Sequence, residues 1–153
     1  MRAGNVLADF LARHKKIGID TSIFIFQIEG NQRYSALVHP VFLWLLKPGS
    51  QGVTSTITMI ELLVQPYRRG DIDSVNRFYA LLSTYPHLEW IEPTLAMAER
   101  AARLRAEHNL RTADALQIAA ALDAGASGFI SHDLAFRKVA GLEILVLEEL
   151  VQS

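Results

Sequence analysis

The chain of 153 residues contains no cysteine. This absence excludes disulfide-stapled scaffolds, thiolate zinc sites, iron–sulfur clusters and cysteine nucleophiles. Cysteine-free composition fits a reducing compartment, and no signal-peptide pattern stands at the start of the sequence, so a cytoplasmic location is expected. The longest apolar runs, at 41–46 and 57–64, fall well short of the ~18 residues needed to cross a bilayer, and no membrane partner is expected.

Charge of either sign is also scarce. Charged residues make up 20% of the chain, and 15 Lys and Arg stand against 16 Asp and Glu, for a net charge of −1. A general nucleic-acid coat is expected to be basic, so any contact with nucleic acid must be local. Hydrophobic residues reach 50%, which excludes a disordered chain. The apolar excess fits either a well-filled core or a surface for self-association.

Apolar patterning predicts alternating strands and helices. Strands are expected at 17–20, 53–57, 88–93, 128–133 and 143–150. Helices are expected at 3–15, 33–46, 58–69, 71–83, 94–108 and 112–124, whereas 22–29 fits a strand or a helix and 134–141 fits a helical turn or a loop. The apolar runs of the strands are continuous, as in sheets covered on both faces. The chain is therefore predicted to form a three-layer α/β/α sandwich around a mostly parallel sheet of four to five strands.

The sequence shows no internal boundary. No linker, repeat or low-complexity tract divides it. We expect a single domain over residues 1–153, in which residues 1–16 form an N-terminal helical extension.

Four acidic residues stand in apolar surroundings that ordinarily exclude charge: Asp20, Glu61, Asp114 and Asp133. An unpaired buried carboxylate is costly, so such a residue must be hydrogen-bonded, neutralised or metal-bound. Asp20 and Asp133 end the first and fourth predicted strands. With the common strand order 3-2-1-4-5, these strands are neighbours at the point where ligands bind in open α/β sheets. We expect all four acids to face that crevice.

Carboxylates without cysteine or a histidine pair are oxygen ligands suited to Mg²⁺ or Mn²⁺. A metal held there would support hydrolysis of a phosphodiester bond. Each acid also has a purely structural interpretation. Asp20 and Asp133 fit turn or cap residues, Asp114 fits an acid that stabilises a helix N-terminus, and Glu61 fits an exposed point on an amphipathic helix.

Three segments resemble PIN domains, and most of all the single-domain ribonuclease toxins of the VapC type. They are 19–24 (IDTSIF), 55–63 (STITMIELL) and 112–136, within a resemblance that spans roughly residues 17–147. The segment 112–136 is the most specific: an Asp opens an apolar helix, a Gly-Ala turn and a strand follow, and Ser-x-Asp-x-x-Phe ends it. The family often begins at the first strand, so residues 1–16 are a departure.

The resemblance implies roles for particular residues. Asp20, Glu61, Asp114 and Asp133 match the acidic quartet that is catalytic and binds Mg²⁺ or Mn²⁺, with Thr21, Ser22 and Ser131 as supporting hydroxyl residues. It implies a metal-dependent endoribonuclease that hydrolyses RNA phosphodiester bonds, as the toxin of a type II toxin–antitoxin pair. Implied partners are RNA, a cognate antitoxin and a second copy of the chain. Arg111, Arg137 and Lys138 lie close to the acids in the sequence and are candidate contacts to substrate.

The sequence leaves one other function open and argues against several more. A catalytically silent PIN-like module that binds RNA or protein stays open. A haloacid-dehalogenase-like phosphatase needs an Asp where Ser22 stands, and a receiver domain needs an Asp at the end of the third strand, where Glu92 stands. Neither a G-x-S-x-G elbow nor a Ser-His-Asp order is present, and no glycine-rich phosphate loop follows the first strand, so a nucleotide cofactor is not expected.

Overall fold

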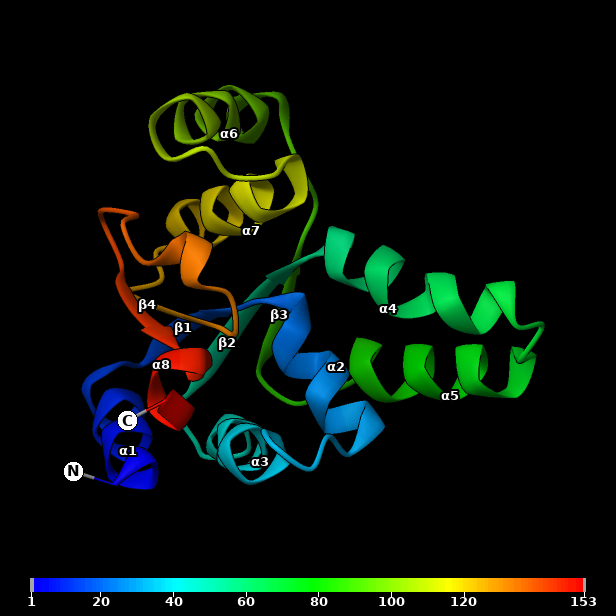
Figure 1. Ribbon diagram of the computed structural model, residues 1–153. Helices are drawn as coiled ribbons and strands as arrows, with labels where there is room; N and C mark the ends of the chain where they lie inside the picture. The colour runs from blue at the N-terminus through cyan, green and yellow to red at the C-terminus, as the bar shows by residue number, and fades with distance from the viewer. Residues whose placement is uncertain (1, 153) are drawn as a thin grey trace.

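The computed structural model describes residues 2–152, and its centre is a parallel sheet (Figure 1). The strands are β1 (Lys16–Ile19), β2 (Gln51–Ser55), β3 (Leu88–Ile91), β4 (Gly128–Ser131) and β5 (Glu143–Val146). Each neighbouring pair is parallel, in the order β3-β2-β1-β4-β5. The predicted fold class and strand order are confirmed. Residues 1 and 153, the ends of the predicted domain, lie outside the described residues.

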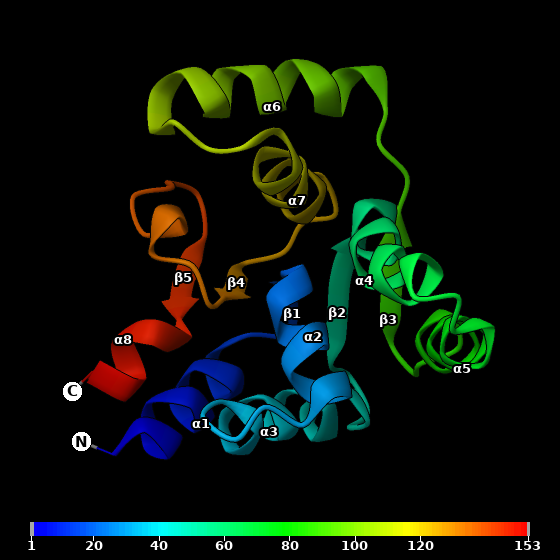
Figure 2. The same cartoon turned by 45° about the vertical axis from the view of Figure 1, so that its right-hand side comes forward.

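Helices cover both faces of the sheet. They are α1 (Ala3–Arg13), α2 (Thr21–Glu29), α3 (Ser35–Leu45), α4 (Thr56–Arg68), α5 (Ile72–Ser83), α6 (Leu95–His108), α7 (Thr112–Asp123) and α8 (Leu147–Gln152), with a 3-10 turn η1 (Leu134–Phe136). Figure 2 shows α6 and α7 on one side of the sheet and α1, α2 and α3 on the other. Helices α4 and α5 extend outward as an antiparallel pair (Figure 1). Within residues 2–152, none of the helices is both long and apolar enough to span a membrane.

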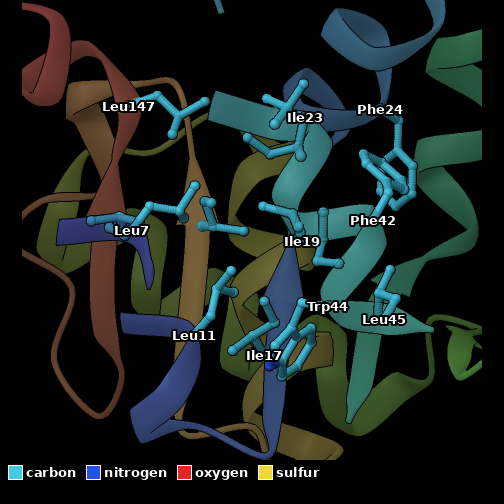
Figure 3. Close-up of a cluster of buried hydrophobic side chains, with 14 of the residues drawn as sticks. Leu7, Leu11, Ile17, Ile19, Ile23, Phe24, Phe42, Trp44, Leu45 and Leu147 are labelled. Atoms are coloured by element: carbon cyan, nitrogen blue, oxygen red, sulfur yellow. The ribbon is translucent and has the colours of Figure 1, made fainter. Parts of the chain in front are cut away.

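Each face of the sheet has its own hydrophobic core. On the face shown in Figure 3, Ile17 and Ile19 of β1 lie among side chains of α1, α2 and α3. The predicted N-terminal helix is present as α1, and it contributes Leu7 and Leu11 to this core. On the other face, Phe129 of β4 belongs to a second core built with α6 and α7. Two cores on two faces make three layers, because each buries one side of the sheet.

Two segments differ from the simplest sequence interpretation. The fifth strand, predicted over 143–150, ends at Val146, and residues 147–152 form α8. The prediction was wrong there because a short apolar run carries no clear period. Glu148 and Glu149 lie in the first turn of α8, where the helix dipole stabilises negative charge. The ambiguous segment 22–29 is helical, and α2 ends at Gly30, which adopts a left-handed φ of 63°.

Close packing of α7 on the sheet depends on Gly18 of β1. A Cβ at Gly18 would lie 2.6 Å from Cδ2 of Phe129 and 2.7 Å from Cβ of Ala121. We expect Gly18→Ala to lower the free energy of unfolding by about 1–3 kcal/mol through overpacking, as measured by urea denaturation. Gly4→Ala on α1 is the control, since a Cβ there meets nothing within 4 Å, and it is expected to be neutral or slightly stabilising. Equal stabilities of the two variants would contradict this account.

Candidate functional site

Asp20 is buried at the carboxyl end of β1, where it also forms the N-cap position of α2. Asp20 is only 7% exposed, and its backbone N–H donates to the Ile130 carbonyl of β4 at 3.0 Å. Oδ2 of Asp20 accepts hydrogen bonds from Ser22 Oγ at 2.9 Å and Ser131 Oγ at 2.8 Å. The two serines that the resemblance marks as supporting residues therefore contact this carboxylate directly.

The turn after β4 fixes the direction of these hydrogen bonds. The backbone N–H of His132 donates to Ser22 Oγ at 3.2 Å, and that of Asp133 donates to Ser131 Oγ at 3.0 Å. A hydroxyl group has one proton to donate. Here each serine oxygen accepts a hydrogen bond from a backbone N–H, and its own O–H donates to Asp20. Both hydroxyl groups are thus oriented as donors toward the carboxylate.

Asp114 is the second buried acid of the site. It lies in the first turn of α7, is 5% exposed, and its negative charge acts on Asp20. Burial raises the pKa of Asp20 from 3.8 to about 6. The charge of Asp114 acts in the same direction, against the hydrogen bonds from Ser131 and Ser22. The charged form of Asp20 is therefore disfavoured unless a cation is near.

Arg111 supplies positive charge to this group of acids. Its Nε donates to Oδ2 of Asp114 at 3.0 Å and its Nη2 to Oδ1 at 3.3 Å, while most of the side chain is exposed. The hydrogen bond to Asp114 raises the pKa of Arg111, and the charges of Asp133 and Glu61 add to the effect. One exposed guanidinium therefore pairs with Asp114, and the charges of two further predicted acids act on it.

Glu61 is held by a chain of polar side chains that starts in the protein interior. Gln117 of α7 is 2% exposed, and its Nε2 donates to the hydroxyl oxygens of Thr21 (3.2 Å) and Thr58. Its Oε1 accepts from the backbone N–H of Ser55 at 3.1 Å. Thr21 in turn donates to Oε1 of Glu61 at 2.8 Å. Gln117 was missed by the sequence reasoning; the only signal was an amide within an otherwise apolar helix.

The remaining predicted residues lie around the turn after β4 and are not all directed at the acids. Oδ1 of Asp133 accepts from the backbone N–H of Ala135 at 2.9 Å and so caps η1. Arg137 donates from both terminal guanidinium nitrogens to Glu149, each at 2.6 Å. Lys138 is exposed next to it. As the side chains stand, Arg137 is engaged in an ion pair and Lys138 is open to solvent.

The donor set suits a hard cation, although the four acids are spread. No group of three His, Asp or Glu side chains among residues 2–152 is close enough together to hold a metal ion. Asp20 and Asp114 are both buried, the negative charge of Asp114 acts on Asp20, and carboxylate oxygens are the ligands that Mg²⁺ and Mn²⁺ prefer. These two acids therefore fit such a cation by their chemistry.

Comparison with known proteins identifies the family. Residues 17–142 match the family model of the PIN domain, and the chain belongs to this family. None of the curated protein sequences matches the chain.

Solved structures of similar fold include several toxins. One is a toxin–antitoxin complex from Klebsiella pneumoniae, at 23% identity and a TM-score of 0.64, covering 86% of this chain and 96% of that one. Another is VapC20 from Mycobacterium tuberculosis, described as a Sarcin-Ricin loop cleaving toxin, at 19% identity and a TM-score of 0.65, with 83% and 97% covered. VapBC-1 from nontypeable Haemophilus influenzae follows at 17% identity and a TM-score of 0.63, with 87% and 98% covered. At these identities the likeness shows the fold.

The raised pKa of Asp20 predicts a pH-dependent stability of the metal-free protein. Its folded-state pKa of about 6 exceeds the ordinary 3.8, so the folded protein binds the proton more tightly than the unfolded chain. The associated stability is full below the ordinary pKa and is lost as the pH rises through about 6, in total about 2–3 kcal/mol. We expect Asp20→Asn to gain that amount relative to wild type between pH 4 and pH 7, by urea unfolding in EDTA. Parallel pH profiles of the two proteins would refute this.

The buried amide of Gln117, at the interior end of the hydrogen-bonded chain to Glu61, is expected to contribute to stability. Gln117→Met keeps the length of the side chain but leaves buried partners without a hydrogen bond. We expect a loss of about 2 kcal/mol or more in the free energy of unfolding. Leu116→Met, at the neighbouring half-buried position, is the control and should cost less than about 1.5 kcal/mol. A similar loss in both variants would show that the amide contacts contribute little.

Proposed function

We propose that this PIN-domain protein is a metal-dependent endoribonuclease, the toxin of a type II toxin–antitoxin pair. The observation that carries the proposal is the buried pair of acids formed by Asp20, at the junction of β1 and β4, and Asp114, in the first turn of α7. Burial and the charge of Asp114 both disfavour the charged form of Asp20, and a cation would stabilise it. This junction is where open parallel sheets bind their ligands. The PIN-domain membership and the toxin structures of similar fold support the same activity.

The residues have separate tasks in this proposal. Asp20 and Asp114 hold Mg²⁺ or Mn²⁺, and Glu61 and Asp133 complete the acidic quartet. The chemistry that such a cation supplies is neutralisation of charge at the scissile phosphate and activation of a water for in-line attack. Ser22 and Ser131 keep Asp20 oriented, and Thr21 does the same for Glu61.

The basic side chains are proposed to contact the RNA backbone. Arg111 would exchange part of its pairing with Asp114 for a phosphate, which its planar fork of donors suits. Lys138 offers an exposed charge beyond η1, and Arg137 contributes if it leaves Glu149. A cognate antitoxin belongs to the same proposal, on the basis of the toxin–antitoxin complex of similar fold. A cytoplasmic location and a homodimer belong to it as well, as the resemblance to VapC-type toxins implies.

A second candidate is a catalytically silent module that binds RNA or protein. It is favoured by the spread of the acids, of which no three within residues 2–152 form a metal-binding group, and by the existing ion pair of Asp114 with Arg111. The two candidates differ in whether a divalent cation binds and whether RNA is cut.

The deciding experiment uses a mixed pool of tRNA and single-stranded RNA. With Mg²⁺ or Mn²⁺ we expect cleavage by wild type, none in EDTA, and a loss of about 100-fold or more in Asp114→Asn, because the variant keeps the shape of the side chain but removes its charge. Asp123→Asn, an exposed position at the end of the same helix, is the matched control and should cleave like wild type.

Mn²⁺ binding, measured by calorimetry on the same proteins, separates the remaining outcomes. Binding that Asp114→Asn weakens, together with metal-dependent cleavage, supports the nuclease. A folded wild-type protein that neither binds Mn²⁺ nor cuts RNA refutes it and leaves the silent module.

A further inference from the structure

A small pocket opens beside Glu61, between α2, α4 and α5. Its volume is about 250 Å³, and Glu61 forms part of its wall. Ile25 and Ile28 of α2 and Phe78 of α5 give it apolar sides. Pockets that take drug-sized ligands have ~300–1,000 Å³, so this one holds a group of about one flat ring system.

The pocket is continuous with the candidate site along two helices. Ile25 lies one helical turn after Thr21, the residue that donates to Glu61, so both lie on one face of α2. Gln65 follows Glu61 by one turn on α4 and also lines the pocket. One turn of α-helix advances ~5.4 Å, so the pocket lies within about one helical turn of Glu61 and Thr21.

Polar groups stand at the rim of the apolar pocket. Glu29 offers an acceptor, Arg69 offers donors, and Gln65 offers both. Neither Glu29 nor Arg69 has an ion-pair partner among the described residues. Pro66 of α4 has no N–H to donate to the Leu62 carbonyl one turn earlier, and both residues line the pocket. The Leu62 carbonyl is therefore a further acceptor in the pocket wall.

Flat apolar faces with donors and acceptors along the edge are the chemistry of a nucleobase. Phe78 provides an aromatic ring for stacking, which unstacked RNA bases use in protein complexes. A second hollow on α4, lined by Met59, Ile60, Leu63, Val64 and Tyr67, carries no charged side chain. The polar rim therefore distinguishes the pocket at Glu61 from an ordinary apolar surface.

We propose that this pocket binds the base of the nucleotide adjacent to the scissile phosphate and thereby selects the cleavage position. The inference rests on the proposed ribonuclease function and adds a specificity subsite to it. The base stacks on Phe78 between the isoleucines of α2, and its edge contacts Glu29 and Arg69.

The test measures base preference in an RNA library randomised on both sides of the cleaved bond. Wild type is expected to prefer certain bases at one flanking position by about 10-fold, the range that one stacked, hydrogen-bonded base supplies. Phe78→Ala and Arg69→Gln are expected to reduce this preference to about 2-fold and to raise KM more than they lower kcat.

Two neighbours provide matched controls. Tyr79→Ala removes an exposed aromatic ring next to Phe78, and Arg68→Gln removes an exposed charge next to Arg69. Neither lines the pocket, so both are expected to keep the wild-type preference. Arg69 is exposed, so its variant remains informative even if Phe78→Ala fails to fold.

A binding measurement separates this proposal from the catalytic one. Short oligoribonucleotides that carry the fluorescent base 2-aminopurine at successive positions are titrated with the Asp114→Asn protein. Stacking on Phe78 is expected to quench the fluorescence at one position, and the quenching should saturate. Adding Phe78→Ala should abolish the quenching, and adding Tyr79→Ala should not. Cleavage with no altered preference and no quenching overturns the pocket but leaves the nuclease. Quenching that depends on Phe78, without metal-dependent cleavage by wild type, overturns the nuclease but leaves a base-binding pocket.

Discussion

The burial of two negative charges, on Asp20 and Asp114, is the constraint on which the rest of the site depends. Side chains with so little exposure lose most of their hydration, and the pKa of Asp20 rises to about 6 for that reason. The surroundings compensate with hydroxyl donors from Ser22 and Ser131 and with the guanidinium of Arg111. The cost of burying the charge of Asp20 still exceeds this compensation, because its pKa stays raised, and a divalent cation would stabilise the charged form.

The sheet brings these acids together by close packing rather than by a loop. Gly18 and the alanine-rich face of α7 allow this helix to lie close against β1 and β4, since any Cβ at Gly18 would collide with Ala121 and Phe129. The first turn of α7 then places Asp114 at the carboxyl end of β1, beside Asp20. Small residues that carry no chemistry themselves thus set the spacing of the charged pair.

Three hydroxyl groups share one pattern around the acids. Ser22, Ser131 and Thr21 each accept a hydrogen bond from an amide N–H and donate their single proton to a carboxylate. This arrangement fixes the orientation of Asp20 and Glu61 from inside the protein. Because Glu61 also forms a wall of the pocket at α2 and α4, the same hydrogen-bonded chain orients both the proposed catalytic acid and the edge of the proposed base subsite.

Much of this could be predicted from the sequence, because continuous apolar strands require two covering layers and a carboxylate in apolar surroundings is costly enough to be conspicuous. The sequence by itself determined the fold class and singled out the four acids as candidates, whereas the strand order 3-2-1-4-5 was assumed as the common one and is the order that the structure has. It could not decide between strand and helix for 22–29, or detect the helix at 147–152, because short apolar runs have no period. Only the tertiary structure decided the role of Gln117 and the pairing of Arg137 with Glu149, since hydrogen-bond partners are chosen by distance in space: Gln117 contacts Thr21 across 96 residues of sequence.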